Sequence, residues 1–208
     1  MAFALVESGK ITKLINGNKG IKIGDTQYPS SFFSTIYSEA ERNAAGVYTI
    51  ELDSTNRKDE TYYINTDITY SYDSSANKVK GTYGTATAKP HADTTYTNTD
   101  KSNGDIPTGK NVGDVKEEGL KTVLIRQVKR KAQEILNETD WYITRNAEKS
   151  TAIPSAITTH RDAVRTKQAS METAITNAAD APALETLYTY TTTDGVTSRP
   201  LGELPTLE

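Results

Sequence analysis

The chain contains no cysteine among its 208 residues. This absence excludes disulfide bridges, thiolate catalysis and cysteine-ligated metal sites, and it is compatible with synthesis in a reducing cytosol. No apolar run approaches the ~18 residues of a membrane-spanning helix, so we expect no membrane partner. The first residues, Met1–Glu7, are too few and lack the basic start of a signal peptide, and they alternate like a strand instead.

Histidine is almost as scarce, with only His91 and His160 in the sequence. Neither has an acidic residue at metal-ligand spacing, and we interpret both as surface polar residues. No serine lies in a Gly-x-Ser-x-Gly elbow. The glycine-rich stretch Gly17–Gly24 is followed by a strand pattern, where a phosphate-binding loop needs a helix. We therefore expect a non-enzymatic protein with no cofactor, no metal and no small-molecule substrate.

An excess of positive charge is also missing, because the formal net charge is −3. The sequence therefore carries no overall electrostatic footprint for nucleic acid. One predicted helix, residues 120–136, does have a basic face. That face lacks interleaved aromatic residues, so solvent or an acidic partner is a better match for it than a phosphate backbone.

Tyrosine and threonine take the place of the missing apolar residues. Hydrophobic residues are only 35% of the chain, and twelve tyrosines accompany three phenylalanines. Both residue types suit a half-wet pleated surface. Two interpretations remain open: an exposed β-structure with a thin core, or one that completes its core against partner subunits. The candidate interface residues are Tyr62, Tyr70, Tyr72, Tyr188, Tyr190, Leu201 and Leu204.

Residues 1–88 are predicted to form a β-rich domain, an antiparallel meander with one short helix. The helix is expected over residues 39–45, because Ser38 and Glu41 have the spacing of a capping box and Gly46 suits the position after a helix. Alternating apolar residues predict strands on both sides of this helix. The expected strands cover residues 3–6 and 11–15 as a hairpin, then 21–23, 47–52, 61–72 and 78–83.

The second half is expected to be helical, which makes the fold class α+β. Residues 89–115 have almost no apolar content and are predicted to be a linker or long loop. Residues 116–180 are predicted to be an antiparallel helical hairpin, with helices at 120–136 and 155–178. Residues 181–208 are expected to hold a short helix at 183–187, a hairpin with an Asp194-Gly195 turn, and an extended C-terminal arm.

The only tryptophan, Trp141, lies between the two predicted long helices. We expect it to be buried at the corner that joins them, because tryptophan buries a large area wherever it packs. Glu148 has the spacing to pair with Arg161 or Arg165 on the facing helix, which would fix the angle between the helices. The predicted structural corner consists of Trp141, Tyr142, Arg145, Glu148, Pro154, Arg161 and Arg165.

Residues of this corner follow the order Thr-Asp-Trp-x-x-x-Arg-x-x-Glu, a proline, and an Arg-x-x-x-Arg helix. The matching residues are Thr139, Asp140, Trp141, Arg145, Glu148, Pro154, Arg161 and Arg165. This pattern resembles a module found in tail proteins of tailed bacteriophages. The opening Phe3–Val6 hairpin, the Ser38–Val47 stretch and the closing Arg199–Pro205 stretch are also similar to such proteins.

The resemblance implies a structural component of the virion: a tail, baseplate or fibre-attachment protein. Its partners would be other phage tail proteins and copies of itself, and it would reside in the virion tail after synthesis in the host cytoplasm. The same module also occurs in tail-fibre assembly chaperones, which are absent from the mature virion. A third possibility, a tail enzyme that degrades host glycans, lacks a convincing carboxylate pair and an elongated β-repeat in this sequence.

Overall fold

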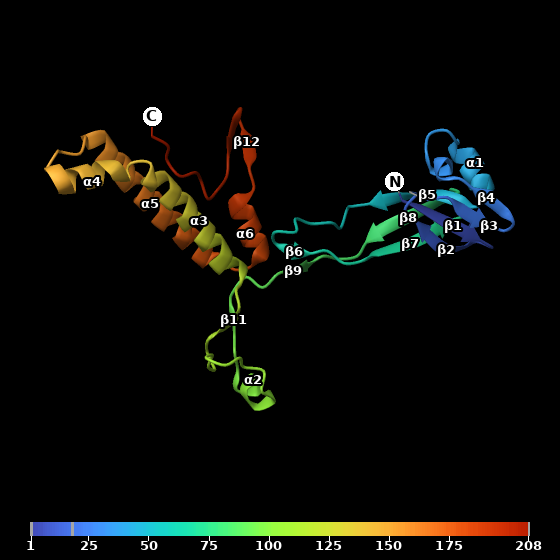
Figure 1. Ribbon diagram of the computed structural model, residues 1–208, viewed down its shortest axis with the longest axis horizontal. Coiled ribbons are helices and arrows are strands. Elements are labelled where there is room, and N and C mark those ends of the chain that lie inside the picture. Colours follow the sequence, from blue (N-terminus) through green and yellow to red (C-terminus); the bar gives the residue numbers. More distant parts are fainter. Residues whose placement is uncertain (1, 18, 208) are drawn as a thin grey trace. The chain divides into compact units, whose positions relative to one another are not determined.

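A computed structural model describes residues 2–17 and 19–207 of the chain (Figure 1). The predicted α+β class is confirmed, with an antiparallel-rich sheet in the N-terminal part and helices in the C-terminal part. The chain divides into two compact units. The first consists of Met1–Glu60 and Ile64–Thr87, and the second of Thr61–Tyr63 and Ala88–Glu208.

The first unit is built on a five-stranded sheet with the order β2-β1-β5-β8-β7. The predicted hairpin of β1 and β2 is confirmed, with Phe3 opposite Ile15. One pairing differs from the expected meander, because β5 and β8 run parallel. Alternation of side chains predicts that a strand exists but does not determine which strand lies beside it. The strands are β1 (Phe3–Glu7), β2 (Lys10–Ile15), β5 (Val47–Asp53), β7 (Ile68–Asp73) and β8 (Lys78–Tyr83).

Strand β1 is buried on both faces, which makes it the centre of this unit. Phe3 and Leu5 point to one side and Ala4 to the other, as the pleat requires. The first side packs with Ile15, Ile21, Phe32, Phe33 and Val47, and the second with Ile50 and Val79. The first cluster is completed by β3 (Ile21–Ile23), β4 (Thr26–Tyr28) and the 3₁₀ helix η1 (Ser30–Phe33).

Helix α1 (Glu39–Ala44) has the predicted capping box: the Ser38 hydroxyl accepts from the Glu41 amide, and the Glu41 carboxylate accepts from the Ser38 amide. Gly46 has φ +80°, as expected of the residue that reverses the chain after a helix. The strand expected over residues 61–72 is interrupted and forms β6 (Tyr63–Ile64) and β7.

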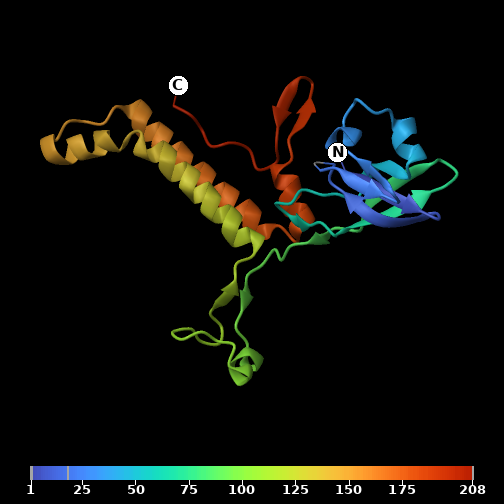
Figure 2. The same ribbon diagram turned by 45° about the vertical axis from the view of Figure 1, so that its right-hand side comes forward.

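The second unit contains the predicted helical hairpin of α3 (Leu120–Asn137) and α5 (Ser155–Asn177), which lie side by side in Figures 1 and 2. They are antiparallel: Leu136, near the end of α3, contacts Arg161 near the start of α5, and Lys121 contacts the far end at Thr176. Each of the two long helices buries one apolar stripe along its length. They consist of Leu124, Val128, Ala132 and Leu136 on α3, and Ile157, Val164, Met171 and Ile175 on α5.

Short elements surround this hairpin. Helix α4 (Asp140–Lys149) joins its two long helices, and α6 (Ala181–Tyr188) follows it. The predicted hairpin with an Asp194-Gly195 turn is confirmed as β12 (Thr191–Thr193) and β13 (Val196–Ser198). The C-terminal arm packs on its own unit: Leu201 is buried, and Leu204 packs against Ala132, Leu136 and Val164. No helix in residues 2–17 and 19–207 is long and apolar enough to cross a membrane.

The segment expected to be a linker or long loop contains ordered elements. These are β10 (Thr94–Thr95), α2 (Asn98–Asn103) and β11 (Val115–Glu117), preceded by β9 (Thr87–Ala88). β10 and β11 pair antiparallel, and the resulting projection, residues 93–118, is visible in Figure 2. We call it the arm. None of its residues is buried, so polar contacts hold it together.

Three residues from the N-terminal half belong to the second unit. Tyr63 donates a hydrogen bond from its hydroxyl to the Glu185 carboxylate at 2.9 Å. The Tyr62 ring lies 6.5 Å from the ring of Tyr188, and its carbonyl accepts from the Lys89 amide at 2.9 Å. The short segment Thr61–Tyr63 therefore packs on the helical unit and is not part of the five-stranded sheet. We call this segment the strap.

Candidate functional site

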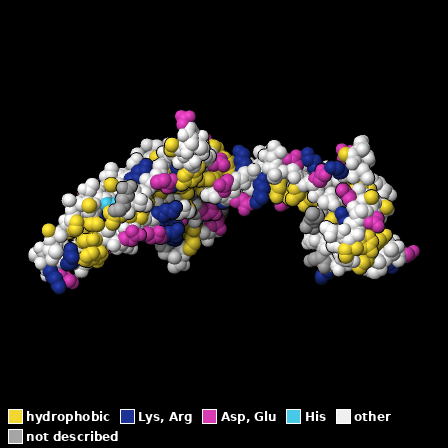
Figure 3. Space-filling model, turned by 90° about the horizontal axis from the view of Figure 1, so that it is seen from above, with side chains coloured by type: hydrophobic (Ala, Val, Ile, Leu, Met, Phe, Trp, Pro, Cys, Tyr) yellow, Lys and Arg dark blue, Asp and Glu magenta, His cyan; other side chains and the backbone are white. Residues whose placement is uncertain are grey.

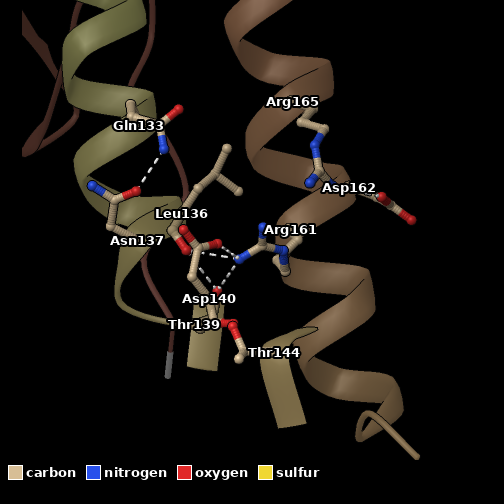
Figure 4. A network of polar contacts seen from close by, with 9 residues as sticks. All are labelled: Gln133, Leu136, Asn137, Thr139, Asp140, Thr144, Arg161, Asp162 and Arg165. Carbon is tan, nitrogen blue, oxygen red and sulfur yellow. Dashed lines mark hydrogen bonds and ion pairs between the residues drawn. The ribbon is translucent and has the colours of Figure 1, made fainter. Parts of the chain in front are cut away.

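Arg161 is the centre of the corner between the long helices (Figure 4). Its side chain is almost completely buried, and its NH1 donates to the Leu136 carbonyl and to the Thr139 hydroxyl oxygen, both at 2.7 Å. The same nitrogen lies 2.9 Å from the Asp140 carboxylate. Because the last carbonyls of a helix lack partners within it, Arg161 caps α3 while it anchors the start of α4.

The ion pair expected between Glu148 and Arg161 or Arg165 is wrong. Arg161 pairs with Asp140, and Arg165 pairs with Asp162 on its own helix at 3.3 Å. Asp140 is the first residue of α4 and lies directly beside the end of α3, whereas Glu148 lies more than two turns further along. Pro154 is the N-cap residue of α5, directly before its first turn.

The expected burial of Trp141 is also wrong, because 52% of its surface is exposed. The corner is filled by Arg161 and Thr139, so its closure does not require the indole. Trp141 instead packs against Tyr142, with ring centroids 3.9 Å apart. The Arg145 guanidinium lies over both rings, 4.6 Å from the Trp141 centroid and 5.6 Å from that of Tyr142.

We call Trp141, Tyr142 and Arg145 the α4 cluster. Arg145 lies one turn after Trp141, which puts both on the same face of the helix. The Arg145 Nε is buried and has no hydrogen-bond partner among the described residues. Tryptophan, tyrosine and arginine are the residues most enriched among those that dominate protein interfaces. In Figure 3, hydrophobic side chains gather at the end of the helical unit where α4 lies.

A pocket of about 400 Å³ lies between α3 and the C-terminal arm. We call it the C-terminal pocket. Val128, Ile135, Met171 and Leu204 supply its apolar lining, and charged side chains surround them. Its polar and charged lining residues are Gln127, Lys131, Glu134, Glu138, Tyr188, Arg199 and Glu203.

An ion pair organises one wall of this pocket. The Arg199 Nε lies 2.7 Å from the Glu203 carboxylate, and Tyr190 donates to the same carboxylate at 2.6 Å. The Arg199 guanidinium lies over the rings of Tyr188 and Tyr190, at 5.3 and 5.1 Å. Burial raises the pKa of Tyr188, whose hydroxyl has no hydrogen-bond partner among the described residues. The C-terminal arm is thus fixed in place by charge and stacking.

The contacts within this wall also shift the pKa values of Tyr190 and Glu203. The hydrogen bond to Glu203 raises the pKa of Tyr190. Burial acts to raise the pKa of Glu203, but the hydrogen bonds from Tyr190 and Arg199 outweigh it and hold that pKa below its ordinary value. Glu203 is therefore a stable anion at neutral pH, engaged by Arg199 and Tyr190.

The predicted interface residues fall in three environments. Tyr62 and Leu201 are buried inside their own unit, so they are not available to a partner. The rings of Tyr70 and Tyr72 are half-buried against the second cluster of the sheet. The remaining three lie at or beside the C-terminal pocket: Tyr188 and Leu204 line it, and Tyr190, 54% exposed, bonds to its wall.

The two histidines lie apart from these sites. His160 is buried on α5, so its expected surface position is wrong, and His91 is half-buried. Within residues 2–17 and 19–207, no group of three or more histidine, cysteine or acidic side chains could hold a metal ion.

No protein-family model, curated protein or solved structure matches the chain. Sequence patterns placed Arg161 in the corner but missed its partner, Asp140, and the C-terminal pocket. The only early signal of the pocket was the stretch Arg199–Pro205, where two prolines predicted an extended arm.

Proposed function

We propose that this protein is a non-enzymatic structural component of a tailed-phage virion, a tail, baseplate or fibre-attachment protein that acts through protein–protein contacts. The observation that supports this best is the arrangement of the residues that resemble the phage tail module. Thr139, Asp140 and Arg161 form one hydrogen-bonded network. That network fixes the helix on which Trp141 and Arg145 are displayed.

The module has a buried part, centred on Arg161, and an exposed part, which includes Trp141. A buried arginine is costly unless its charge and hydrogen bonds are satisfied. The Arg161 NH1 has three acceptors, while its Nε is buried without a hydrogen-bond partner among the described residues. Three residues of the module, Thr139, Asp140 and Arg161, therefore have a structural role: they hold the corner together. Trp141 and Arg145 add little to the closure of the corner. A partially exposed aromatic–arginine cluster is instead typical of residues that bind another protein.

The arm formed by residues 93–118 is a second feature that favours a role in assembly. None of the residues 93–118 is buried, and two apolar side chains among them, Val112 and Val115, expose 40% and 41% of their surface to solvent. A projection without a core gains little stability by itself, whereas it can gain apolar burial when it lies against a neighbouring protein. Projecting arms of this kind suit a protein that joins subunits.

The tail-fibre assembly chaperone remains the alternative, since the same module supports it. Mass spectrometry of purified particles of the encoding phage separates the two roles. We expect the protein in particles that withstand a density gradient and a high-salt wash. Its presence in infected-cell lysate but absence from those particles would overturn the structural role and leave the chaperone.

A matched pair of variants links the test to the α4 cluster. Phage that encode Trp141→Ala are expected to incorporate less of the protein, because the cluster loses its largest contact surface. Arg165→Ala changes an exposed side chain on α5 and is expected to leave incorporation unchanged. Equal incorporation of both variants would mean that the α4 cluster does not contribute to assembly.

A further inference from the structure

We infer that Asn103 is a site of spontaneous deamidation, a modification that converts its side-chain amide into a carboxylate and loosens the arm. Two asparagines of the chain, Asn16 and Asn103, are followed by glycine. A glycine leaves the backbone nitrogen after the asparagine unhindered, because it has no Cβ. The sequence therefore offers two candidate sites, and the structure separates them.

Asparagine is a thermolabile residue, and its deamidation needs only the chain itself and water. The backbone nitrogen of Gly104 attacks the side-chain carbonyl carbon of Asn103 and closes a five-membered succinimide ring. The bond from that carbon to the amide nitrogen breaks, and ammonia leaves with the proton of the Gly104 nitrogen. Water then opens the ring at either carbonyl, and the product is an aspartate or an isoaspartate.

Asn103 is the last residue of α2, and its side chain is exposed. Gly104 follows in the left-handed conformation with φ +78°. Beyond the adjoining residues, no described atom lies within 4 Å of the position that a Cβ of Gly104 would take. In Figure 1, α2 lies at the end of the arm away from α3. The two reacting groups are thus open to solvent, with no packed neighbour to hold them apart.

One contact protects Asn103 in the closed helix. The Gly104 N–H donates to the carbonyls of Asp100 and Lys101, which withholds its nitrogen from the reaction. The helix that provides these carbonyls has only six residues, and none of them is buried. Helices of that length are marginal in water, and helix ends open locally. Deamidation therefore proceeds from the opened last turn, and its rate follows how often that turn opens.

Two polar contacts keep α2 closed. Thr97 and Asp100 form a capping box at its start, and the Lys116 ammonium lies 2.5 Å from the Asp100 carboxylate. The Lys116 side chain is partly exposed, and an ion pair in contact with solvent contributes only modestly to stability. Loss of this pair is therefore expected to open the helix more often and to speed the reaction at Asn103.

Asn16 is also followed by glycine, but its environment differs. A Cβ at Gly17 would lie 2.9 Å from the ring of Phe3 and 3.1 Å from the Cβ of Phe33, so the glycine backbone packs on the core of the first unit. Phe3 and Phe33 are both buried. Movement of the Gly17 nitrogen disturbs this packing, which costs more than opening one exposed turn. We therefore expect Asn16 to keep its amide.

The product of the reaction changes the arm. A carboxylate at residue 103 places negative charge at the C-terminal end of α2, where the helix dipole is already negative. Asp100 and Asp105 are close in sequence, so like charges gather there. An isoaspartate also adds a methylene to the backbone, which displaces the amides of Gly104 and Asp105 from the Asp100 carbonyl. Each product therefore favours the open state of α2.

Peptide mass spectrometry of the full-length protein tests the assignment. After incubation at mildly alkaline pH, Asn103 in the tryptic peptide Ser102–Lys110 is expected to convert to the acid about tenfold faster than Asn16 in Leu14–Lys19. Fragmentation of each peptide locates the converted residue. Equal rates at the two sites of the folded protein, or faster conversion of Asn16, would overturn the inference.

The same incubation in denaturant is the control for sequence. Both sites are then expected to convert at rates within about threefold of each other, because both are followed by glycine and neither is protected by structure. An Asn16 that is as slow in denaturant as in the folded protein would also overturn the inference, because sequence alone would then explain the difference.

A matched pair of variants tests the role of helix opening. Lys116→Ala removes the partner of Asp100 and is expected to raise the rate at Asn103 about two- to fivefold, as the loss of one exposed ion pair predicts. Lys149→Ala removes the same charge from α4 and is expected to leave that rate unchanged. An unchanged rate in Lys116→Ala, or an equal rise in both variants, would contradict reaction from the opened helix.

Amide hydrogen exchange tests the consequence for the arm. Asn103→Asp, which reproduces the aspartate product, is expected to accelerate exchange in α2 and β11. Asn16→Asp is the control and is expected to leave exchange in the arm unchanged. Equal exchange of the arm in the wild type and in Asn103→Asp would show that the modification does not loosen it, and would overturn that part of the inference.

Discussion

The Arg161 guanidinium lies 2.9 Å from the Asp140 carboxylate, and the same nitrogen reaches the last turn of α3. The Arg161 side chain thus joins the end of α3 to the start of α4. It donates to a carbonyl at the end of α3 and to the Thr139 hydroxyl, and it pairs with the Asp140 carboxylate. The corner is closed by polar contacts around a buried arginine rather than by the tryptophan beside it.

Replacing Arg161 with methionine is expected to destabilise the helical unit by about 2–4 kcal/mol, because the Leu136 carbonyl and the Thr139 hydroxyl lose a buried donor. Arg161→Lys keeps the charge but not the planar guanidinium, and we expect an intermediate loss. Urea unfolding followed by circular dichroism at 222 nm measures both. Arg165→Met is the control and is expected to stay within about 0.5 kcal/mol of the wild type.

Trp141→Ala is expected to lower the free energy of unfolding by less than about 1 kcal/mol, because half of the indole is already in solvent. Its effect should appear in assembly, where less of the variant is expected to be incorporated into phage particles. A loss of several kcal/mol in the monomer would mean that the indole packs inside the corner after all.

Gly119→Ala is expected to disrupt the junction between the arm and α3. A Cβ at this position would lie 2.3 Å from the backbone carbon of Ala92, and the Gly119 amide donates to Asp93 at 2.7 Å. Backbone cannot move aside as a flexible side chain can, so we expect a cost of about 1–3 kcal/mol. Amide hydrogen exchange of the arm should accelerate in this variant. Glu117→Ala, an exposed change nearby, should leave exchange unchanged.

The order of the arm is expected to decrease in acid. Lys116 and Thr97 bind the Asp100 carboxylate and hold its pKa well below its ordinary value of 3.8. Because the folded-state pKa is depressed, the stabilisation is complete above pH 3.8 and is lost as pH falls through the folded pKa. The amide resonances of Thr97 and Lys116 should report this transition. In the Asp100→Asn variant, these two amide resonances should not show this pH-dependent transition.

Tyr63→Phe is expected to destabilise the helical unit by about 0.5–1.5 kcal/mol, the usual net value of one hydrogen bond, here to Glu185. The five-stranded sheet should be unaffected. Hydrogen exchange resolved by segment distinguishes the two: faster exchange in α6 agrees with the strap, and faster exchange in β7 or β8 contradicts it.

The regular elements were predictable because their signals are local. The three-to-four spacing of Leu124, Val128 and Ala132 determines which face of α3 is buried, and Ser38 with Glu41 determines where α1 begins. The parallel pairing of β5 with β8 was not predictable, because alternation within a strand says nothing about its neighbour.

The corner was only partly predictable for a similar reason. Helical spacing placed Arg161 on the face toward the turn, but its partner depends on how the chain leaves α3, and that angle puts Asp140 in reach instead of Glu148. Trp141 was expected inside because large apolar side chains usually are. The space it would have filled is taken by a buried arginine and Thr139.

The strap Thr61–Tyr63 has a consequence for any attempt to divide the chain. Neither unit is continuous in sequence, because the helical unit borrows three residues from within the span of the sheet unit. A protease cut between Gly84 and Thr87 is therefore expected to leave two fragments that co-elute, held by Tyr63 on Glu185 and by Tyr62 beside Tyr188. Deleting residues 1–87 would instead remove Tyr62 and Tyr63, and the surface of α6 that they contact, at Glu185 and Tyr188, would be exposed.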